Sequence, residues 1–229
     1  MAKVKFSAFV SDIRNKSNGS VFSKNRYGSI IRNKVTPTNP QTQAQQQARS
    51  SLGNLSSSFR GLTIDQIKSW NSAGKNFPFT DIFGDVKHLS GQTLFVKLNA
   101  NLEKVNLPRV LSAPAPSGFP ELPEATLDTT FVGGDLVELA FKSGLTAIPA
   151  GYTMVAYATP GISRSISFVK NEFRFIGEVL YSAGEGDLAF LWNARFAPPL
   201  EDEVIHVKIA LIKNSSGQQS IPLIVQATV

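Results

Sequence analysis

The stretch PRVLSAPAPSGFPELP (residues 108–123) decides the predicted fold, because the hydrophobic pattern differs on its two sides. Proline cannot continue a helix and pushes the residue before it towards extended backbone, so this composition is typical of a semi-rigid linker. Apolar residues recur at helical spacing before the linker, whereas strand-like runs follow it. The sequence therefore predicts an α+β protein with a domain boundary at residues 108–123.

Residues 124–229, C-terminal to the linker, are predicted to form an all-β domain. Runs rich in β-branched and aromatic residues cover 125–131, 135–142, 152–159, 172–180, 187–195, 203–212 and 221–229. Turn residues such as Gly133-Gly134 and Pro160-Gly161 separate the runs, and no helix-length pattern lies between them, so the sheets should be antiparallel. The spacing predicts an antiparallel β-sandwich of about seven strands, immunoglobulin-like or fibronectin-like.

Residues 39–107, N-terminal to the linker, are predicted to form a small helical unit. Asn39 can cap a first helix whose first position is Pro40. A narrow apolar stripe follows at spacings of three and four residues, comprising Ala44, Ala48, Leu52, Leu55 and Phe59. So thin a stripe predicts close packing against another helix, either in the same chain or in the next copy.

Two further helices are predicted in this unit. Thr63 and Gln66 form a capping-box pattern for the second helix, and Ser90 can start the third. A short connection makes the first two helices a helical hairpin. Its core is expected to contain three large apolar side chains, those of Leu55, Phe59 and Trp70.

Residues 1–38 are predicted to form an extended basic arm with short strands. The run KVKFSAFV (residues 3–10) alternates at period two. Asn18-Gly19 and Tyr27-Gly28 are turn signals, and a short strand-like run follows each of them. Such strands contain few apolar side chains to bury, so they need a partner surface.

The charge of the chain is divided between its ends. The total of +6 combines 16 Lys/Arg against five Asp/Glu in residues 1–109, a net +11, with seven against 12 in residues 110–229, a net −5. Asp12 is the single acid in residues 1–60, which contain ten bases. This polarity favours head-to-tail contact between copies of the chain, or contact of the basic end with an acidic partner or nucleic acid.

Residue types used in catalysis and metal binding are scarce. The chain has no cysteine and two histidines, with His88 predicted in a loop and His206 in a strand, where structural or solvent-facing roles are usual. The cluster Glu201-Asp202-Glu203 could offer oxygen ligands to Ca²⁺, but its spacing fits no EF-hand loop, which favours a charged turn. The N-terminus has no apolar stretch typical of a signal peptide or membrane span. We therefore predict a non-enzymatic protein without cofactor, metal or membrane contact.

Three strings in the basic half carry a family resemblance. They are GSVFSKNRYG (residues 19–28), RNKVTPTNPQTQAQ (residues 32–45) and the segment from Leu62 to Trp70, with Arg49 between the last two. Together they resemble the N-terminal module of small virion-associated structural proteins of tailed bacteriophages, of the crass-like phage type, over about residues 12–75. The resemblance implies a structural protein made in the host cytoplasm and built into the virion. A ring-type protein of the neck or tail, in contact with other virion proteins, is the position that it suggests.

The leading hypothesis is assembly of many copies into a ring or lattice through the basic N-terminal module. In this module cations alternate with aromatic and aliphatic side chains, a mixture that fits an arm ordered against a neighbouring subunit. The candidate subunit contacts are Phe22, Arg26, Tyr27, Arg32, Arg49 and Trp70.

Two alternatives use different chemistry. The same cations and aromatic side chains could contact the phosphates and stack on the bases of a nucleic acid, although no known nucleic-acid-binding pattern occurs. A carbohydrate- or receptor-binding virion protein could instead use Trp192, Tyr181 and Phe196 as a platform. Trp192 lies inside a strand-like run, which favours core packing over a platform.

Overall fold

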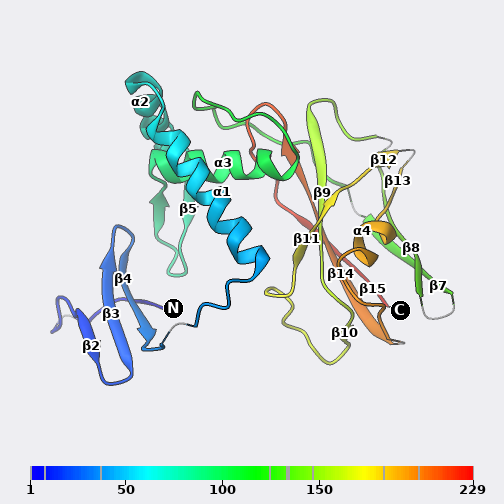
Figure 1. Cartoon of the computed structure of the whole chain (residues 1–229), viewed down its shortest axis with the longest axis horizontal. Coiled ribbons are helices and arrows are strands. Elements are labelled where there is room, and N and C mark those ends of the chain that lie inside the picture. Colours follow the sequence, from blue (N-terminus) through cyan, green and yellow to red (C-terminus); the bar gives the residue numbers. More distant parts are fainter. Residues whose placement is uncertain are drawn as a thin grey trace.

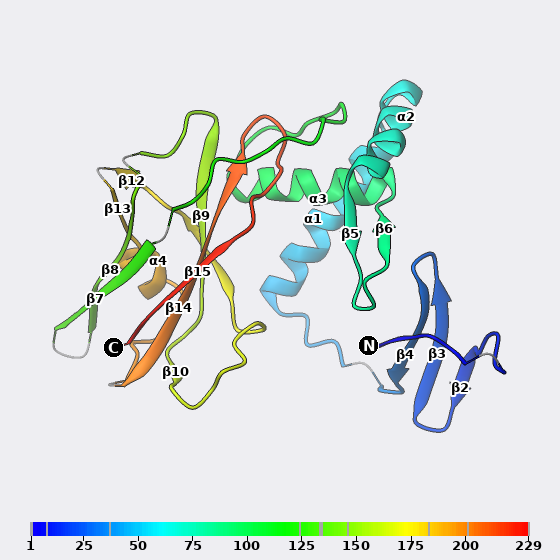
Figure 2. The same cartoon turned by 180° about the vertical axis from the view of Figure 1, so that it is seen from behind.

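The computed structural model of the chain describes residues 2–228 except 8, 37, 124, 133, 134, 146, 183 and 201. It is a mixed α+β structure with antiparallel sheets and few helices (Figure 1). A small N-terminal sheet, a helical unit and a larger two-sheet unit follow one another along the chain (Figure 2). The turn predicted at Gly133-Gly134 and the predicted cluster residue Glu201 lie outside the described residues.

The N-terminal sheet consists of four short strands. These are β1 (Ala2–Val4), β2 (Asn15–Ser17), β3 (Ser20–Asn25) and β4 (Gly28–Asn33), in the order β1-β4-β3-β2. Asn18 takes a left-handed φ of 49° in the turn between β2 and β3, and Gly28 takes a φ of 116° after the next turn. Asparagine and glycine tolerate this conformation, so both predicted turns are confirmed.

The helical unit contains three helices. They are α1 (Gln43–Arg60), α2 (Ile64–Ala73) and α3 (Gly91–Lys104). The predicted capping box is confirmed, because Thr63 Oγ1 accepts from Gln66 N and Gln66 Oε1 accepts from Thr63 N. The predicted cap of the third helix is also confirmed, because Ser90 Oγ accepts from Thr93 N.

The predicted start of the first helix is wrong. The helix begins at Gln43, and Thr42 Oγ1 accepts a hydrogen bond from Gln45 N at 3.4 Å. Gln41 has a left-handed φ of 50°, which a right-handed helix cannot include, so Pro40 lies outside the helix. Asn39 accepts instead a hydrogen bond from the guanidinium of Arg49 at 2.9 Å.

The three helices share one apolar core. Leu55, Trp70 and Phe95 are fully buried in it, and Phe59 packs partly buried against them. The rings of Trp70 and Phe95 meet edge-on with centroids 5.2 Å apart. The indole Nε1 of Trp70 donates to the carbonyl oxygen of Leu111 at 2.8 Å, so its polar atom is satisfied inside the core. The predicted core of the helical hairpin is therefore confirmed.

A β-hairpin lies between α2 and α3, and its first strand begins in the aromatic stretch FPFTDIF (residues 77–83). A 3₁₀ turn, η1 (Gly74–Asn76), leads into β5 (Pro78–Thr80), which pairs with β6 (Val86–His88). His88 therefore lies in a strand, which corrects its predicted position in a loop.

The C-terminal unit is built from two antiparallel sheets. One has the order β12-β13-β8-β7 and contains β7 (Ala125–Val132), β8 (Asp135–Ser143), β12 (Tyr181–Ser182) and β13 (Glu185–Asp187). The other contains β9 (Tyr152–Ala158), β10 (Ile162–Ser163), β11 (Arg174–Glu178), β14 (Glu203–Lys213) and β15 (Leu223–Thr228). Six of the seven predicted runs thus coincide with strands, whose bounds differ by a few residues.

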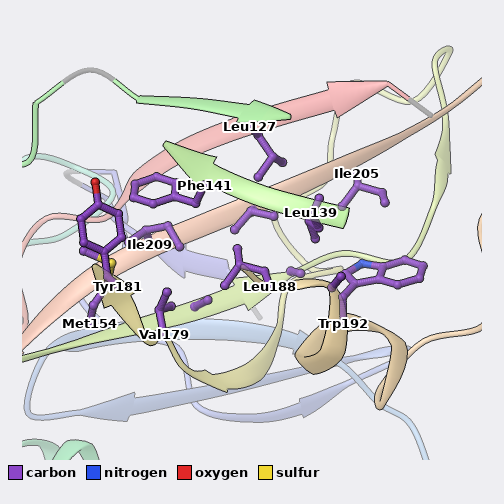
Figure 3. Close-up of a cluster of buried hydrophobic side chains, with 14 of the residues drawn as sticks. Leu127, Leu139, Phe141, Met154, Val179, Tyr181, Leu188, Trp192, Ile205 and Ile209 are labelled. Carbon is purple, nitrogen blue, oxygen red and sulfur yellow. The ribbon is translucent and has the colours of Figure 1, made fainter. Parts of the chain in front are cut away.

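Both C-terminal sheets contribute side chains to one core (Figure 3). Leu139 and Phe141 come from β8, whereas Met154 comes from β9 and Ile205 from β14. On β14, Ile205 and the residues at period two from it enter this core, whereas Ala210 and Ile212, which alternate with them, pack in a separate cluster. Burying two apolar sheet faces against each other accounts for the period-two pattern of the runs.

The seventh predicted run, 187–195, is a helix and not a strand. It forms α4 (Ala189–Asn193), and Asp187 Oδ1 accepts from Ala189 N at 2.8 Å as the chain leaves β13. Leu188 and Trp192, four residues apart, are fully buried, whereas Phe190 between them is exposed. A short apolar run is compatible with both a strand and a helix, and here the buried residues follow the helical spacing of four.

Residues 108–123 are bonded to the helical unit and to the two-sheet unit. Asn99 Oδ1 on α3 accepts from Val110 N at 2.7 Å. In the middle of the segment, the side chain of Gln218 accepts from Ser117 N at 3.1 Å and donates to Ala115 O at 2.8 Å. These hydrogen bonds fix the conformation of the proline-rich segment. The predicted division into segments 1–38, 39–107, 108–123 and 124–229 stays a prediction.

Candidate assembly surface

The N-terminal sheet has no buried core. None of the described residues from 2 to 54 is buried, although the sheet has four strands. Its apolar side chains, Val21, Phe22, Ile30 and Ile31, are only partly buried. A sheet of this size needs an apolar face packed on a partner to be stable in water, so this sheet leaves surface for a partner to cover.

One face of the sheet is partly covered by the β5–β6 hairpin. Lys3 Nζ forms an ion pair with Asp81 Oδ2 at 2.8 Å, and the ring of Tyr27 meets that of Phe79 edge-on at 5.7 Å. A second ion pair joins Lys5 to Asp85 at 3.3 Å, where the Lys5 side chain is 61% and the Asp85 side chain 40% exposed. The hairpin thus links the sheet to the helical unit through side chains.

Asp81 is the centre of this link. One oxygen of its carboxylate accepts from the backbone nitrogens of Phe83 and Asp85 at 2.8 and 3.1 Å, which shapes the hairpin turn. The other oxygen binds Lys3, and the side chain is only 3% exposed. The Lys3 ammonium, aided by these backbone donors, lowers the pKa of Asp81 to about 2.

This pKa predicts that the link depends on pH. Because the docked carboxylate has a depressed pKa, it stays charged where an ordinary Asp, with a pKa of about 3.9, becomes protonated. The ion pair therefore stabilises docking of the sheet above about pH 4, and this contribution is lost as the pH falls towards 2. Lys3→Met should raise the midpoint of the Asp81 titration, measured by carboxylate NMR.

Lys5→Met is the matched control for this titration. It also removes one lysine of the arm, but Lys5 pairs with Asp85 and not with Asp81. The midpoint of Asp81 should stay near 2 in the control. A midpoint that is equally low in Lys3→Met would contradict the assigned pair.

The uncovered part of the same face is a basic hollow. Lys16, Val21 and Arg32 lie opposite one another on β2, β3 and β4, so their side chains share a face. Neighbouring strands are about 4.8 Å apart, so the backbone positions of Lys16 and Arg32 are about 10 Å apart, with Val21 between them. The hollow has a volume of about 370 Å³ and is lined by Lys16, Val21, Arg32, Asn33, Lys34, Val35 and Thr36.

The cations of the basic hollow have no counter-ion within the described part of the chain. Lys16, Arg32 and Lys34 are exposed and take part in no ion pair or side-chain hydrogen bond with described residues. Arg26, in the turn between β3 and β4, is in the same situation. By contrast, Asp12 binds Arg14 at 2.8 Å. Four unpaired cations beside partly buried apolar side chains form a surface suited to an acidic partner.

Four of the predicted contact residues lie on this sheet. Phe22 and Ile31 pair across β3 and β4 on the face opposite to the basic hollow. Arg26 is exposed at the turn, Tyr27 packs on Phe79, and Arg32 lines the hollow.

The other two predicted contacts lie elsewhere. Arg49 is exposed on α1 and bonded to Asn39, away from the sheet. Trp70 is fully buried in the helical core, so it is not available to a neighbouring subunit, which corrects its assignment as a contact residue. Its size and its hydrogen bond to Leu111 give it a packing role instead.

Sequence reasoning missed the partners of the arm inside the chain. Asp81 and Phe79 belong to the β5–β6 hairpin, and their contacts with Lys3 and Tyr27 span more than 50 residues. The available signal was Asp81 followed by Gly84, which is typical of a turn and could have indicated the hairpin.

The structure does not support the predicted receptor platform. Trp192 is fully buried and its indole Nε1 donates to the carbonyl oxygen of Thr159 at 2.9 Å. Tyr181 is 7% exposed, and its hydroxyl donates to the carbonyl oxygens of Ser143 and Leu145. Phe196 packs on the ring of Trp192 with centroids 5.3 Å apart. These three side chains belong to the core and not to a binding surface.

Within the described residues, no group of three or more His, Asp or Glu side chains could hold a metal ion. No helix in the described part of the chain has the length and apolar character needed to cross a membrane. Comparisons of the chain with protein-family models, with curated proteins and with solved structures find no match.

Proposed function

We propose that this chain is a non-enzymatic structural component of a bacteriophage virion that forms homo-oligomers through its N-terminal sheet. A ring-type protein of the neck or tail, in contact with other virion proteins, is the proposed position. The resemblance of residues 12–75 to small virion-associated proteins supports a structural role in the virion, and the exposed sheet supports assembly into homo-oligomers.

The observation that carries the assembly proposal is the sheet without a core. Ordering the backbone of one residue costs about 1–2 kcal/mol, and burial of apolar area is what normally offsets this cost. The sheet buries none of its described residues, and the ion pairs Lys3–Asp81 and Lys5–Asp85 lie at its surface. A neighbouring subunit that covers this sheet would supply the missing burial.

For the C-terminal unit we propose an immunoglobulin-like or fibronectin-like sandwich that serves as a decoration or inter-subunit module. The shared core of two antiparallel sheets supports a sandwich. Proteins that share this kind of sandwich have many unrelated functions, so the fold alone assigns no function to this unit.

Mass photometry of the full-length protein tests the assembly proposal. We expect discrete multimers of the 24.8 kDa chain. The double variant Arg26→Glu/Arg32→Glu should shift the distribution towards monomers, because it places acids on the exposed basic surface. A predominantly monomeric wild-type protein that is also absent from purified virions would contradict the proposal.

The control for this experiment is Lys68→Glu/Lys75→Glu. Both lysines are exposed, on α2 and on the following 3₁₀ turn, and the net charge changes by the same amount. This variant should keep the wild-type distribution of masses. Loss of multimers in the control as well would indicate a general effect of net charge.

A second candidate function is nucleic-acid binding, which the three cations of the basic hollow favour. It predicts DNA binding that weakens steeply with salt. The logarithm of the binding constant should fall with the logarithm of the salt concentration, with a slope of about 0.7 to 0.9 for each neutralised phosphate. Arg26→Glu/Arg32→Glu should then abolish most of the affinity in a fluorescence anisotropy titration. No binding at low salt, together with multimers, would exclude this candidate.

A further inference from the structure

The outer face of the sheet β12-β13-β8-β7 is acidic. Glu185 on β13 pairs with Lys142 on β8, and Asp128 and Glu138 lie on the same face of β7 and β8. The ammonium of Lys142 binds Asp128 at 2.9 Å. This acidic face, defined as Asp128, Glu138 and Glu185 around Lys142, has three carboxylates for one described cation.

The pKa of Lys142 reflects the negative charges around it on this face. Its hydrogen bond and charge interaction with Asp128, followed by the charges of Glu185 and Glu138, raise its pKa above the ordinary value. Asp128 and Glu185 are exposed, so their charges are available to a partner. One lysine leaves the face with a net negative charge.

The acidic face and the basic hollow lie at opposite ends of the molecule. The N-terminal sheet occupies one end of the long axis, and β7 and β8 occupy the other, with the helical unit and β9, β11 and β14 between them (Figure 1). The view from behind shows the same separation (Figure 2). The hollow of one chain therefore cannot reach the acidic face of the same chain, although the two surfaces have opposite charge.

We propose that the basic hollow of one copy docks on the acidic face of the next copy, so that the chains associate head to tail. This contact rests on the assembly function proposed above, and it identifies the acidic face of a second copy as the partner of the basic hollow. Lys16, Arg32 and Lys34 meet Asp128, Glu138 and Glu185 of the neighbour, while Val21 and Val35 of the hollow are covered.

Head-to-tail contact uses two different surfaces and is therefore heterologous. Such contacts repeat from copy to copy, and they produce a closed ring when the rotation between copies closes and a filament when it does not. The division of charge in the sequence, net +11 in residues 1–109 and net −5 in residues 110–229, is the same polarity at the level of the whole chain. An isologous contact between two N-terminal sheets would instead bring like charges together.

Charge reversal on each surface tests this contact in the full-length, nuclease-treated protein. The hollow variant is Lys16→Glu/Arg32→Glu, and the face variant is Asp128→Lys/Glu185→Lys. By mass photometry, each variant alone should need more than about 100-fold higher concentration than the wild type to form multimers, because like charges then meet. An equimolar mixture of the two variants should form multimers again, because every hollow then finds a surface of opposite charge.

The outcomes separate this inference from the proposed function. Loss of multimers in the hollow variant but not in the face variant would overturn head-to-tail docking and leave assembly through the N-terminal sheet intact. A mixture that stays monomeric would also overturn the docking. A wild-type protein that is monomeric after nuclease treatment would overturn both, and multimers that disappear only with the nuclease would indicate bridging by nucleic acid. Lys68→Glu/Lys75→Glu, with wild-type multimers, excludes a general charge effect.

Discussion

Replacing Trp192 by alanine is expected to destabilise the C-terminal unit by about 3–5 kcal/mol, a large part of the stability of most domains. The side chain is fully buried in the core that the two sheets share, together with Leu188 (Figure 3), and its ring packs on that of Phe196. Its removal leaves a cavity and deprives the carbonyl oxygen of Thr159 of its donor. Hydrogen exchange of β9 and β14 is the measurement, with urea unfolding followed by circular dichroism.

The remaining tryptophan makes this experiment more specific. The chain has two tryptophans, and Trp70 lies in the helical core, so its fluorescence in Trp192→Ala reports on the helical unit alone. The matched control is Phe190→Ala in the same helix, where the ring is 80% exposed and its loss should change stability by less than about 0.5 kcal/mol. A stable Trp192→Ala protein that had lost glycan or cell binding would contradict the packing role of Trp192 and support the receptor-binding alternative.

Replacing Gly217 by alanine is expected to destabilise the joint between α3 and the loop after β14, by about 2–5 kcal/mol. Gly217 has a left-handed φ of 70°, and an added Cβ would meet the carbonyl oxygen of Leu98 and, at 3.0 Å, the side chain of Leu102. The backbone of α3 would have to move away. Asn101, which donates to Gly217 O at 3.0 Å, would then lose a buried partner.

Gly151→Ala separates the two causes of this effect. Gly151 has a similar left-handed φ of 83°, but nothing lies within 4 Å of an added Cβ. It should show only the conformational cost, about 1–2 kcal/mol. Thermal unfolding of both variants, with hydrogen exchange of α3, compares the two sites. An equal loss at both sites would show that the contact of Gly217 with α3 adds nothing.

The elements predicted well are those defined by neighbouring residues. Thr63 with Gln66 and Ser90 form helix caps within three residues of chain, and the turn at Asn18-Gly19 needs only a residue that tolerates positive φ. Six runs of β-branched and aromatic residues became strands because their alternate side chains enter one core. The start of the first helix failed for a local reason, the left-handed backbone at Gln41, which is a poor position to foresee in glutamine.

Other features required contacts between residues far apart in the chain. The run around Trp192 fits a strand or a helix by itself, and burial of Leu188 and Trp192 on one side of a helical turn decided between them. The same holds for Tyr181, which sequence alone places equally well on a surface. For the candidate surface, the sequence indicated the cations but not which of them are paired.

The sequence by itself therefore determined the α+β class, the caps and turns, and the division of charge between the two halves, because each depends on composition or on residues a few positions apart. Only the tertiary structure decided which charges remain available. Pairing of Lys3 with Asp81 consumed one cation of the arm, while the register of β2, β3 and β4 gathered Lys16 and Arg32 on one face. Charge interactions in salt solution are largely screened beyond about 8–10 Å, so the positions of these groups in space, and not in the chain, set the surface that a partner meets.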